Sequence, residues 1–240
     1  MSIAEKELVI SANNLTIAEN VEKVYNAGYE KGKSEGGGLP KELEWVNHSY
    51  AVSFYGDTLI DEVVTLSFPS TVKSFTNFWY LSSANHTTKH VILNLEGQIT
   101  TAQRLFFTAG QVNANLGMYA LEQITLNCNT SKVTSFQQFI RSCDVTTIDG
   151  TPLDFSSASS INTFCNRCFK LSYIRIVPNT IKVNADFSGS YSWSDESLDS
   201  IVYGLAKVEE KQILTLHSDV VLRLTADHWA YIADNNWDVN

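Results

Sequence analysis

The sequence has little proline and no long apolar run, and each shortage excludes a class of protein. Four Pro among 240 residues leave no Pro-rich linker or tail. No stretch approaches about 18 uninterrupted apolar residues, so we predict no membrane insertion. Charged residues appear as early as Glu5 and Lys6, where a secretory signal peptide would begin its apolar segment. We therefore expect no signal peptide, and a protein that leaves the cytoplasm only by lysis or inside a particle.

Basic residues are also scarce. Lys and Arg number 17 against 26 Asp and Glu, which gives a formal net charge of −9. Such a chain repels a polyanion, and no basic stripe offsets the repulsion, so we predict no nucleic-acid partner. Hydrophobic residues make up 44% of the chain and charged residues 18%, a balance typical of a folded protein with a sizeable core.

The motifs of the common enzyme classes are absent. The sequence has no G-x-S-x-G, H-E-x-x-H, P-loop or G-x-G-x-x-G pattern. The acidic pair Asp195-Glu196 fits a helix start. The five His are scattered, and the one pair spaced i, i+4, His86 and His90, lacks the Glu of an H-E-x-x-H motif. We predict that the protein is not an enzyme, has no catalytic residues and uses no cofactor or metal.

The four cysteines are few and scattered. Cys165 and Cys168 form a C-x-x-C, a spacing found in zinc sites and in redox pairs. A zinc site needs two further ligands, and Cys128 and Cys143 are the only other thiols. Without export the thiols stay reduced, so small buried positions in the fold are the favoured interpretation. Cys143 and Cys168 are then expected to stack about one or two repeats apart.

An amphipathic helix is predicted near the N-terminus. Thr16 opens it with a capping box, and Ile17, Val21, Val24 and Gly28 follow the 4-3-4 spacing of a short coiled-coil seam. The glycine-rich residues 34–38 then form a flexible linker. The helix either packs on its own domain or serves for self-association or docking to a partner, and the sequence leaves both open.

A repeat in the middle of the chain is the strongest pattern in the sequence. Pairs of apolar residues two apart recur at intervals of 21 to 31 residues. The pairs are Val64/Leu66, Leu93/Leu95, Ile124/Leu126, Leu153/Phe155 and Ile174/Ile176. A second, Phe-containing element lies between them at residues 72–78, 133–139 and 161–169, and its copy from Ile99 is degenerate, with Ala102 in place of an aromatic residue.

Such a repeat has a physical meaning. One short strand with one turn of helix cannot bury its own apolar face, whereas stacked copies form a continuous core. Residues 121–126 read L-x-x-I-x-L and residues 171–176 read L-x-x-I-x-I, which match the strand segment of a leucine-rich repeat. We predict an α/β repeat fold, a short irregular leucine-rich repeat solenoid of four to five units. A parallel β-helix and an irregular β-sandwich are the alternatives.

The last part of the chain has a different pattern. Ser194 followed by Asp195 and Glu196 predicts a helix start, residues 213–216 a short strand, and Ser218 and Thr225 further N-caps. An end of this kind closes a solenoid by covering its last repeat. The predicted organisation is residues 1–38 for the helix and linker, 39–190 for the solenoid with an N-terminal cap, and 191–240 for an α/β C-terminal cap.

The sequence pattern of the repeats resembles that of a known family. Residues 139–143 and 168–176 are similar to the F-x-x-C-x-x-L-x-x-I-x-L pattern of BspA-like bacterial leucine-rich repeats. The flanking segments 17–33, 148–157 and 214–237 resemble those of phage and prophage proteins from gut Firmicutes. The resemblance implies a virion-associated or prophage-encoded repeat protein that binds a partner, and it brings no catalytic residues.

Three hypotheses for the function follow. The first is a non-enzymatic phage structural or receptor-binding protein of tail-fibre or head-fibre type, located in the virion or, during assembly, in the host cytoplasm. Its partners would be a second copy of itself or other virion proteins, and a host surface protein or glycan. The second is a bacterial BspA-like adhesin or protein–protein interaction module, which needs an export route. The third is a carbohydrate-active enzyme on a β-helix, which the carboxylate-poor strands disfavour.

Overall fold

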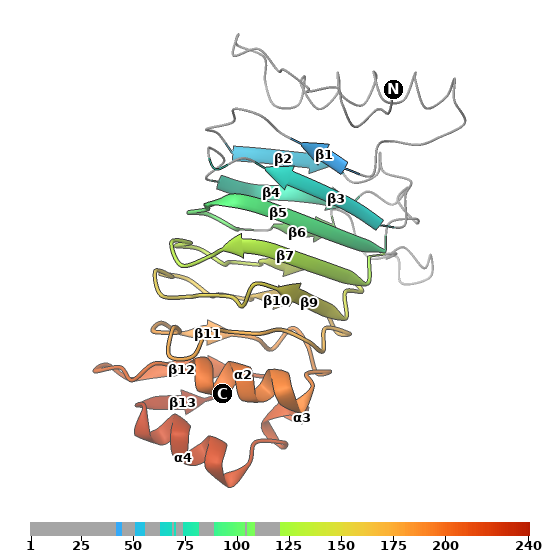
Figure 1. Cartoon of the computed structure of the whole chain (residues 1–240). Coiled ribbons are helices and arrows are strands. Elements are labelled where there is room, and N and C mark those ends of the chain that lie inside the picture. Colours follow the sequence, from blue (N-terminus) through green and yellow to red (C-terminus); the bar gives the residue numbers. More distant parts are fainter. Residues whose placement is uncertain are drawn as a thin grey trace, which may run out of the picture.

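The computed structural model describes residues 42–44, 51–55, 63–68, 70, 74–81, 89–103, 105–108 and 121–240 (Figure 1). The predicted N-terminal helix with Ile17, Val21, Val24 and Gly28 lies outside these residues, as does the glycine-rich linker. Within the described ranges, none of the helices combines the length and the apolar character needed to cross a membrane.

Two five-stranded parallel sheets make up the body of the molecule. The first sheet has the order β1 (Glu42–Glu44), β3 (Val63–Phe68), β5 (His90–Gln98), β7 (Gln123–Asn129) and β9 (Thr147–Gly150). The second has the order β2 (Ala51–Tyr55), β4 (Ser74–Leu81), β6 (Phe106–Thr108), β8 (Ile140–Arg141) and β10 (Cys165–Asn166). Because successive strands alternate between the sheets, the chain winds in stacked coils with one strand in each sheet (Figure 1).

The strand register aligns the repeats and corrects one predicted pair. Val64 lies opposite Val91, which lies opposite Ile124, which lies opposite Ile148. The first-sheet pair of the second coil is therefore Val91/Leu93 and not Leu93/Leu95. The side chains of residues 91, 93 and 95 all point into the core. Because inward-pointing residues recur every two positions along a strand, the predicted pair can be shifted by two residues without changing the pattern.

The fourth coil is three residues longer here than the fifth, and this also shifted its predicted pair. Ile148 continues the apolar row, and Leu153 returns to pair with Ile176. Residues 150–152 bulge between these two positions. Gly150 has a φ of 93°, and a Cβ there would lie 2.6 Å from the Leu126 carbonyl oxygen, so only glycine fits.

For the second element of each coil, the sequence predicts one turn of helix. In the described residues this element is instead a turn that leads into a strand. Ala102, in the degenerate copy, is buried at the position that Phe136 takes in the next coil. Large aromatic rings fill the core between the sheets from the third coil onward, including a Phe139–Phe164 stack with ring centroids 5.0 Å apart. The fully buried aromatic side chains there are Phe136, Phe139, Phe155, Phe164, Phe187 and Trp193.

Backbone hydrogen bonds join the coils where each one enters the first sheet. The N–H of Glu122 donates to the Lys89 carbonyl, Thr146 to Glu122, Ser172 to Thr146 and Ser194 to Ser172, each at 2.8 Å. This ladder continues through five successive coils, and its last member is the N-cap of α2 (Asp195–Gly204). The helix therefore begins in register with the coils that precede it.

Helix α2 closes the end of the first sheet. Its predicted N-cap, Ser194, accepts the Ser197 N–H, and Leu198, Ile201 and Val202 are buried. Ser200 accepts a hydrogen bond from the Ile176 N–H at 2.7 Å, so a helix side chain takes the role of a next strand. An open sheet edge is thereby covered.

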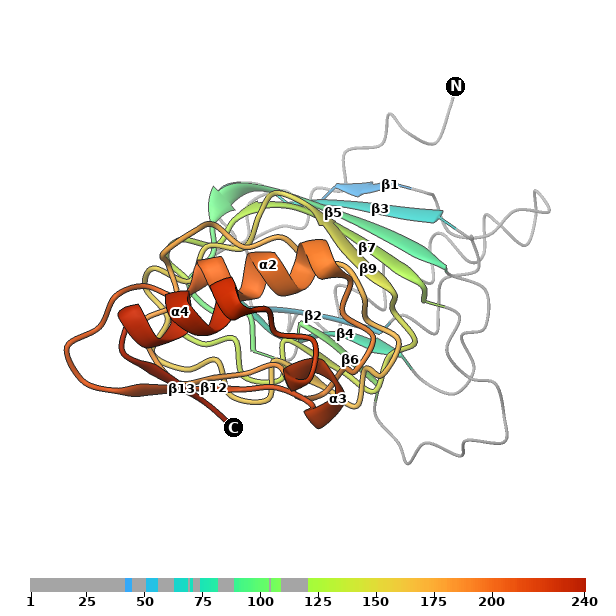
Figure 2. The same cartoon turned by 90° about the horizontal axis from the view of Figure 1, so that it is seen from below.

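The remaining elements cover the end of the stack. β11 (Ala185–Asp186), β12 (Gln212–Thr215) and β13 (Trp237–Val239) form a parallel three-stranded sheet. Figure 2 shows α4 (Ala226–Asp234) beside α2, with α3 (Ser218–Val221) near them. Thr225 is the N-cap of α4 as predicted, whereas α3 is capped by His217 and not by Ser218, because the His217 ring accepts the Asp219 N–H.

Candidate functional site

Alternate residues of the first sheet point away from the core and form a surface that we call the outer face. Along β5 the side chains of Val91 and Leu93 are buried, whereas His90 and Asn94 are half-buried. The described side chains of the outer face are Val63, Thr65, Ser67, His90, Ile92, Asn94, Gln123, Thr125, Asn127, Thr147 and Asp149, followed by Tyr173 and Arg175 of the next coil.

A ladder of amides runs across the outer face. Asn127 donates to the Asn94 side-chain oxygen at 2.8 Å, and Asn94 donates to the Ser67 hydroxyl at 3.3 Å. The three residues stand opposite one another in β3, β5 and β7. Each amide is thus oriented by its neighbours, which leaves the remaining donors and acceptors in fixed directions.

A second polar group on the outer face surrounds His90. The His90 Nε2 lies 2.8 Å from the Thr125 hydroxyl, and Gln123 donates to one carboxylate oxygen of Asp149 at 2.9 Å. The other oxygen, Asp149 Oδ1, is buried and has no hydrogen-bond partner among the described residues. Burial lowers the pKa of His90, and the Asp149 carboxylate opposes this in part. At neutral pH the site therefore holds a neutral imidazole and polar groups suited to hydrogen bonding.

A hollow of about 320 Å³ lies where the outer face meets α2. Its walls come from three places in the chain: the bulge of the fourth coil, the coil that follows it, and α2. The lining residues are Pro152, Arg175, Ile176, Pro178, Glu196, Asp199, Ser200 and Tyr203. The last four are spaced i, i+3, i+4, i+7, which places them on one face of the helix.

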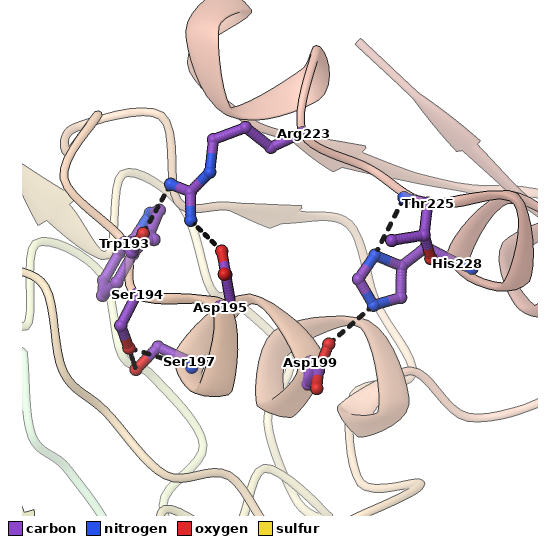
Figure 3. A network of polar contacts seen from close by, with 8 residues as sticks. All are labelled: Trp193, Ser194, Asp195, Ser197, Asp199, Arg223, Thr225 and His228. Atoms are coloured by element: carbon purple, nitrogen blue, oxygen red, sulfur yellow. Dashed lines mark hydrogen bonds and ion pairs between the residues drawn. The ribbon is translucent and has the colours of Figure 1, made fainter.

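A polar network holds α2 against the C-terminal elements (Figure 3). Arg223 donates to the Trp193 carbonyl and forms an ion pair with Asp195 at the first turn of α2. His228 Nε2 lies 2.8 Å from Asp199 Oδ1, and its Nδ1 accepts the Thr225 N–H at 3.3 Å. His228 is buried, whereas the Asp199 side chain is 55% exposed, so the contact lies at the edge of the buried region. The helix that lines the hollow is thus fixed at its first residue and near its middle.

The Tyr203 ring is fixed from behind by two other rings. It makes edge-to-face contacts with His228 and Tyr231, with ring centroids 5.8 and 5.0 Å apart. The Tyr231 hydroxyl donates to Asn179 at 2.8 Å, and burial raises its pKa. Tyr203 remains 38% exposed and lines the hollow. An aromatic ring held in this way is preorganised for contact with a ligand.

A row of rings on another part of the surface is a further candidate. Phe169 and Tyr191 come from successive coils and stack with centroids 5.8 Å apart, and His217 follows at 5.4 Å from Tyr191. Phe169 is 51% exposed and Tyr191 49%. An ion pair of Lys170 with Asp144 at 2.6 Å flanks the row. Large exposed aromatic side chains of this kind are frequent anchors of protein interfaces.

The thiols take no part in these surfaces. All four cysteines are buried and free. The pairing of Ile140 with Cys165 and of Arg141 with Asn166 places Cys143 next to Cys168 in adjacent coils, within the predicted range. Each donates to the carbonyl two residues before it, Arg141 and Asn166 respectively. In the part of the chain that is described, no cluster of three or more His, Cys, Asp or Glu is arranged to hold a metal ion.

The sequence did not predict the hollow. The sequence predicts only a helix start at Asp195 and Glu196, and the structure places both in the first turn of α2. Residues 196, 199, 200 and 203 lie on one helical face, but the residues that complete the hollow, 152 and 175–178, come from preceding coils. Comparisons with protein-family models, curated proteins and solved structures found no match for this chain.

Proposed function

We propose that this chain is a non-enzymatic, virion-associated recognition protein of tail-fibre or head-fibre type. Its stacked coils would be a short irregular leucine-rich repeat solenoid that presents a rigid surface to a host protein or glycan. The observation that carries the proposal is the outer face, where polar side chains of successive coils orient one another through hydrogen bonds such as Asn127 to Asn94 and Gln123 to Asp149.

Rigidity is the reason this surface suits recognition. Binding costs free energy when side chains and loops must be ordered, and a surface built on strands avoids much of that cost. The outer-face residues lie on paired strands of one sheet and the hollow is lined by a helix pinned at Asp195 and Asp199. Polar groups held in fixed positions discriminate between ligands by leaving mismatched groups unpaired.

The N-terminal segment would supply attachment. Ile17, Val21, Val24 and Gly28 would form a seam that joins copies of the chain or docks it to another virion protein. A glycine-rich linker would then let the recognition body reorient relative to the particle. Several weak sites on one oligomer bind a cell surface far more tightly than one site does.

A protein–protein interaction module of adhesin type is the second candidate. The exposed stack of Phe169 on Tyr191 favours it, because rings of this kind act as interface anchors. An adhesin must reach the cell surface of the bacterium that makes it, so surface labelling of intact producing cells separates it from the first candidate.

The virion assignment is tested on purified particles. Particles are collected from lysing cells that carry the gene and banded in a density gradient, and their proteins are identified by mass spectrometry. The proposal predicts that this chain bands with the particles at a constant ratio to the capsid protein. Its recovery only from the soluble lysate, or on intact producing cells, would overturn the virion assignment.

A further inference from the structure

We propose that the hollow between the coils and α2 binds one neutral hexose residue of a surface glycan. This inference rests on the proposed function and gives it a ligand class. The hollow combines a fixed aromatic ring, Tyr203, with two carboxylates, Glu196 and Asp199, on the same helical face. Those are the two kinds of group that a sugar ring engages, through its C–H faces and its hydroxyls.

The size of the hollow limits the ligand to about one sugar residue. Its volume of about 320 Å³ is at the lower end of the range found for small-molecule sites. Apolar walls come from Pro152, Pro178 and Tyr203, and Ile176 lies at the base with 5% exposure. A pyranose ring presents C–H groups on its faces and hydroxyls at its rim, which matches apolar walls with polar groups between them.

The polar groups in the hollow are mostly acceptors. Asp199 uses Oδ1 for His228, and Glu196 uses Oε1 for the Tyr173 hydroxyl at 3.4 Å. The second oxygen of each carboxylate makes no hydrogen bond to a described residue. Hydroxyl donors to a carboxylate form strong, charge-assisted hydrogen bonds, so two neighbouring carboxylates suit two hydroxyls of one sugar.

Charge excludes acidic sugars from the same place. Arg175 is the one cation in the lining, and it already donates to the Gly150 carbonyl. A carboxylate or phosphate on the ligand would therefore face Glu196 and Asp199 with little compensation, and like charges at short range are repulsive. The hollow is accordingly assigned to a neutral hexose and not to a sialic acid or a sugar phosphate.

The site is also preorganised. The network of Figure 3 fixes α2 through Arg223 and His228, and the rings of His228 and Tyr231 support the Tyr203 ring. Ser200 is fixed as well, because its hydroxyl accepts the Ile176 N–H. A ligand thus meets a helix and an aromatic ring whose positions are already fixed, which favours affinity.

The test uses the full chain and simple glycosides. Methyl glucoside, methyl galactoside and methyl mannoside are titrated by saturation-transfer NMR, with sialic acid as the charged comparison. Saturable binding of at least one neutral hexoside is expected, without binding of sialic acid. Glu196→Gln, which keeps the side-chain shape, is expected to weaken that binding about tenfold, and Tyr203→Ala at least as much.

Trp229→Ala is the matched control, because Trp229 is an exposed aromatic residue of α4 that does not line the hollow. It is expected to bind like the unchanged protein. The inference is overturned if none of the three hexosides binds, if sialic acid binds better, or if Glu196→Gln binds as tightly as the parent. Cell binding that persists while the hexosides fail refutes the ligand class and leaves the proposed function standing.

Discussion

The hydroxyl of Ser197 accepts a hydrogen bond from the Ile174 N–H at 2.9 Å and donates one to the Ile174 carbonyl at 3.1 Å. One buried side chain thereby satisfies both backbone groups that a further strand would otherwise satisfy. Ser197 is 0% exposed and is also joined to the N-cap residue Ser194. The end of the first sheet and the start of α2 are therefore one structural unit.

Replacing that hydroxyl should cost considerable stability. Ser197→Ala leaves the N–H and C=O of Ile174 buried without partners, and each such group costs about 1–3 kcal/mol. We expect the free energy of unfolding to fall by about 2–4 kcal/mol in urea denaturation, with an unchanged slope. Ser156→Ala, at an exposed hydroxyl that bonds to no described residue, serves as the control. Equal stability of the two variants would refute the sheet-closing role.

The cysteines should resist alkylation in the native protein. Burial raises the pKa of Cys128 to about 12, so at pH 8 only about one molecule in 10,000 carries the thiolate there. Burial also raises the pKa of Cys165 well above its usual range. Iodoacetamide at pH 8 is expected to leave the native mass unchanged and to add four labels in urea. Rapid labelling of the native protein would show that the coils open readily.

The stability of the fold should fall in mild acid because of His90. Its pKa is lowered by burial, so the unfolded chain binds a proton at a higher pH than the folded one. The contribution of a neutral His90 is complete above the unfolded pKa, about 6.5, and is lost as the pH falls from there through the folded pKa. Urea midpoints of the parent and His90→Gln are compared between pH 7.5 and 5. The parent should lose more stability over this range, and parallel curves would contradict the account.

We propose that oligomerisation uses the N-terminal seam. Light scattering on the full chain is expected to give a dimer or trimer, since the seam is too short to distinguish them. Val21→Glu combined with Val24→Glu places charge in the seam and should give a monomer with unchanged circular dichroism. A monomeric parent would mean that the helix packs on its own domain or docks to another protein, and the adhesin candidate would then gain equal standing.

The sequence predicted local features well and long-range ones less well. The N-caps Ser194 and Thr225 are encoded within one helical turn, and the structure confirms them. The pair predicted at Leu93 was wrong by two residues, because the alternation of buried and exposed side chains along a strand looks the same after a shift of two. Nothing in the local pattern of residues 148–153 indicated that Gly150 begins a bulge.

The candidate site depended on contacts that span coils. The ladder from Asn127 to Ser67 joins residues separated by a full coil at each step, so the register had to be known before it could be recognised. The hollow needed both the bulge at Pro152 and the placement of α2, and only the second had a local sequence pattern. The role of His228 was likewise missed, because its partner Asp199 lies 29 residues earlier.

The central claim is that the outer face recognises the host surface, and a cell-binding isotherm tests it most directly. Fluorescently labelled full-length protein is titrated onto host cells alongside the double variant Thr125→Lys, Asn127→Lys, with the exposed Glu210→Lys as control. All three are first shown to have the same circular dichroism. Saturable binding that the double variant weakens by about tenfold or more, and that the control retains, is the predicted result. Absence of binding by the parent protein, or equal binding by parent and double variant, would contradict the account.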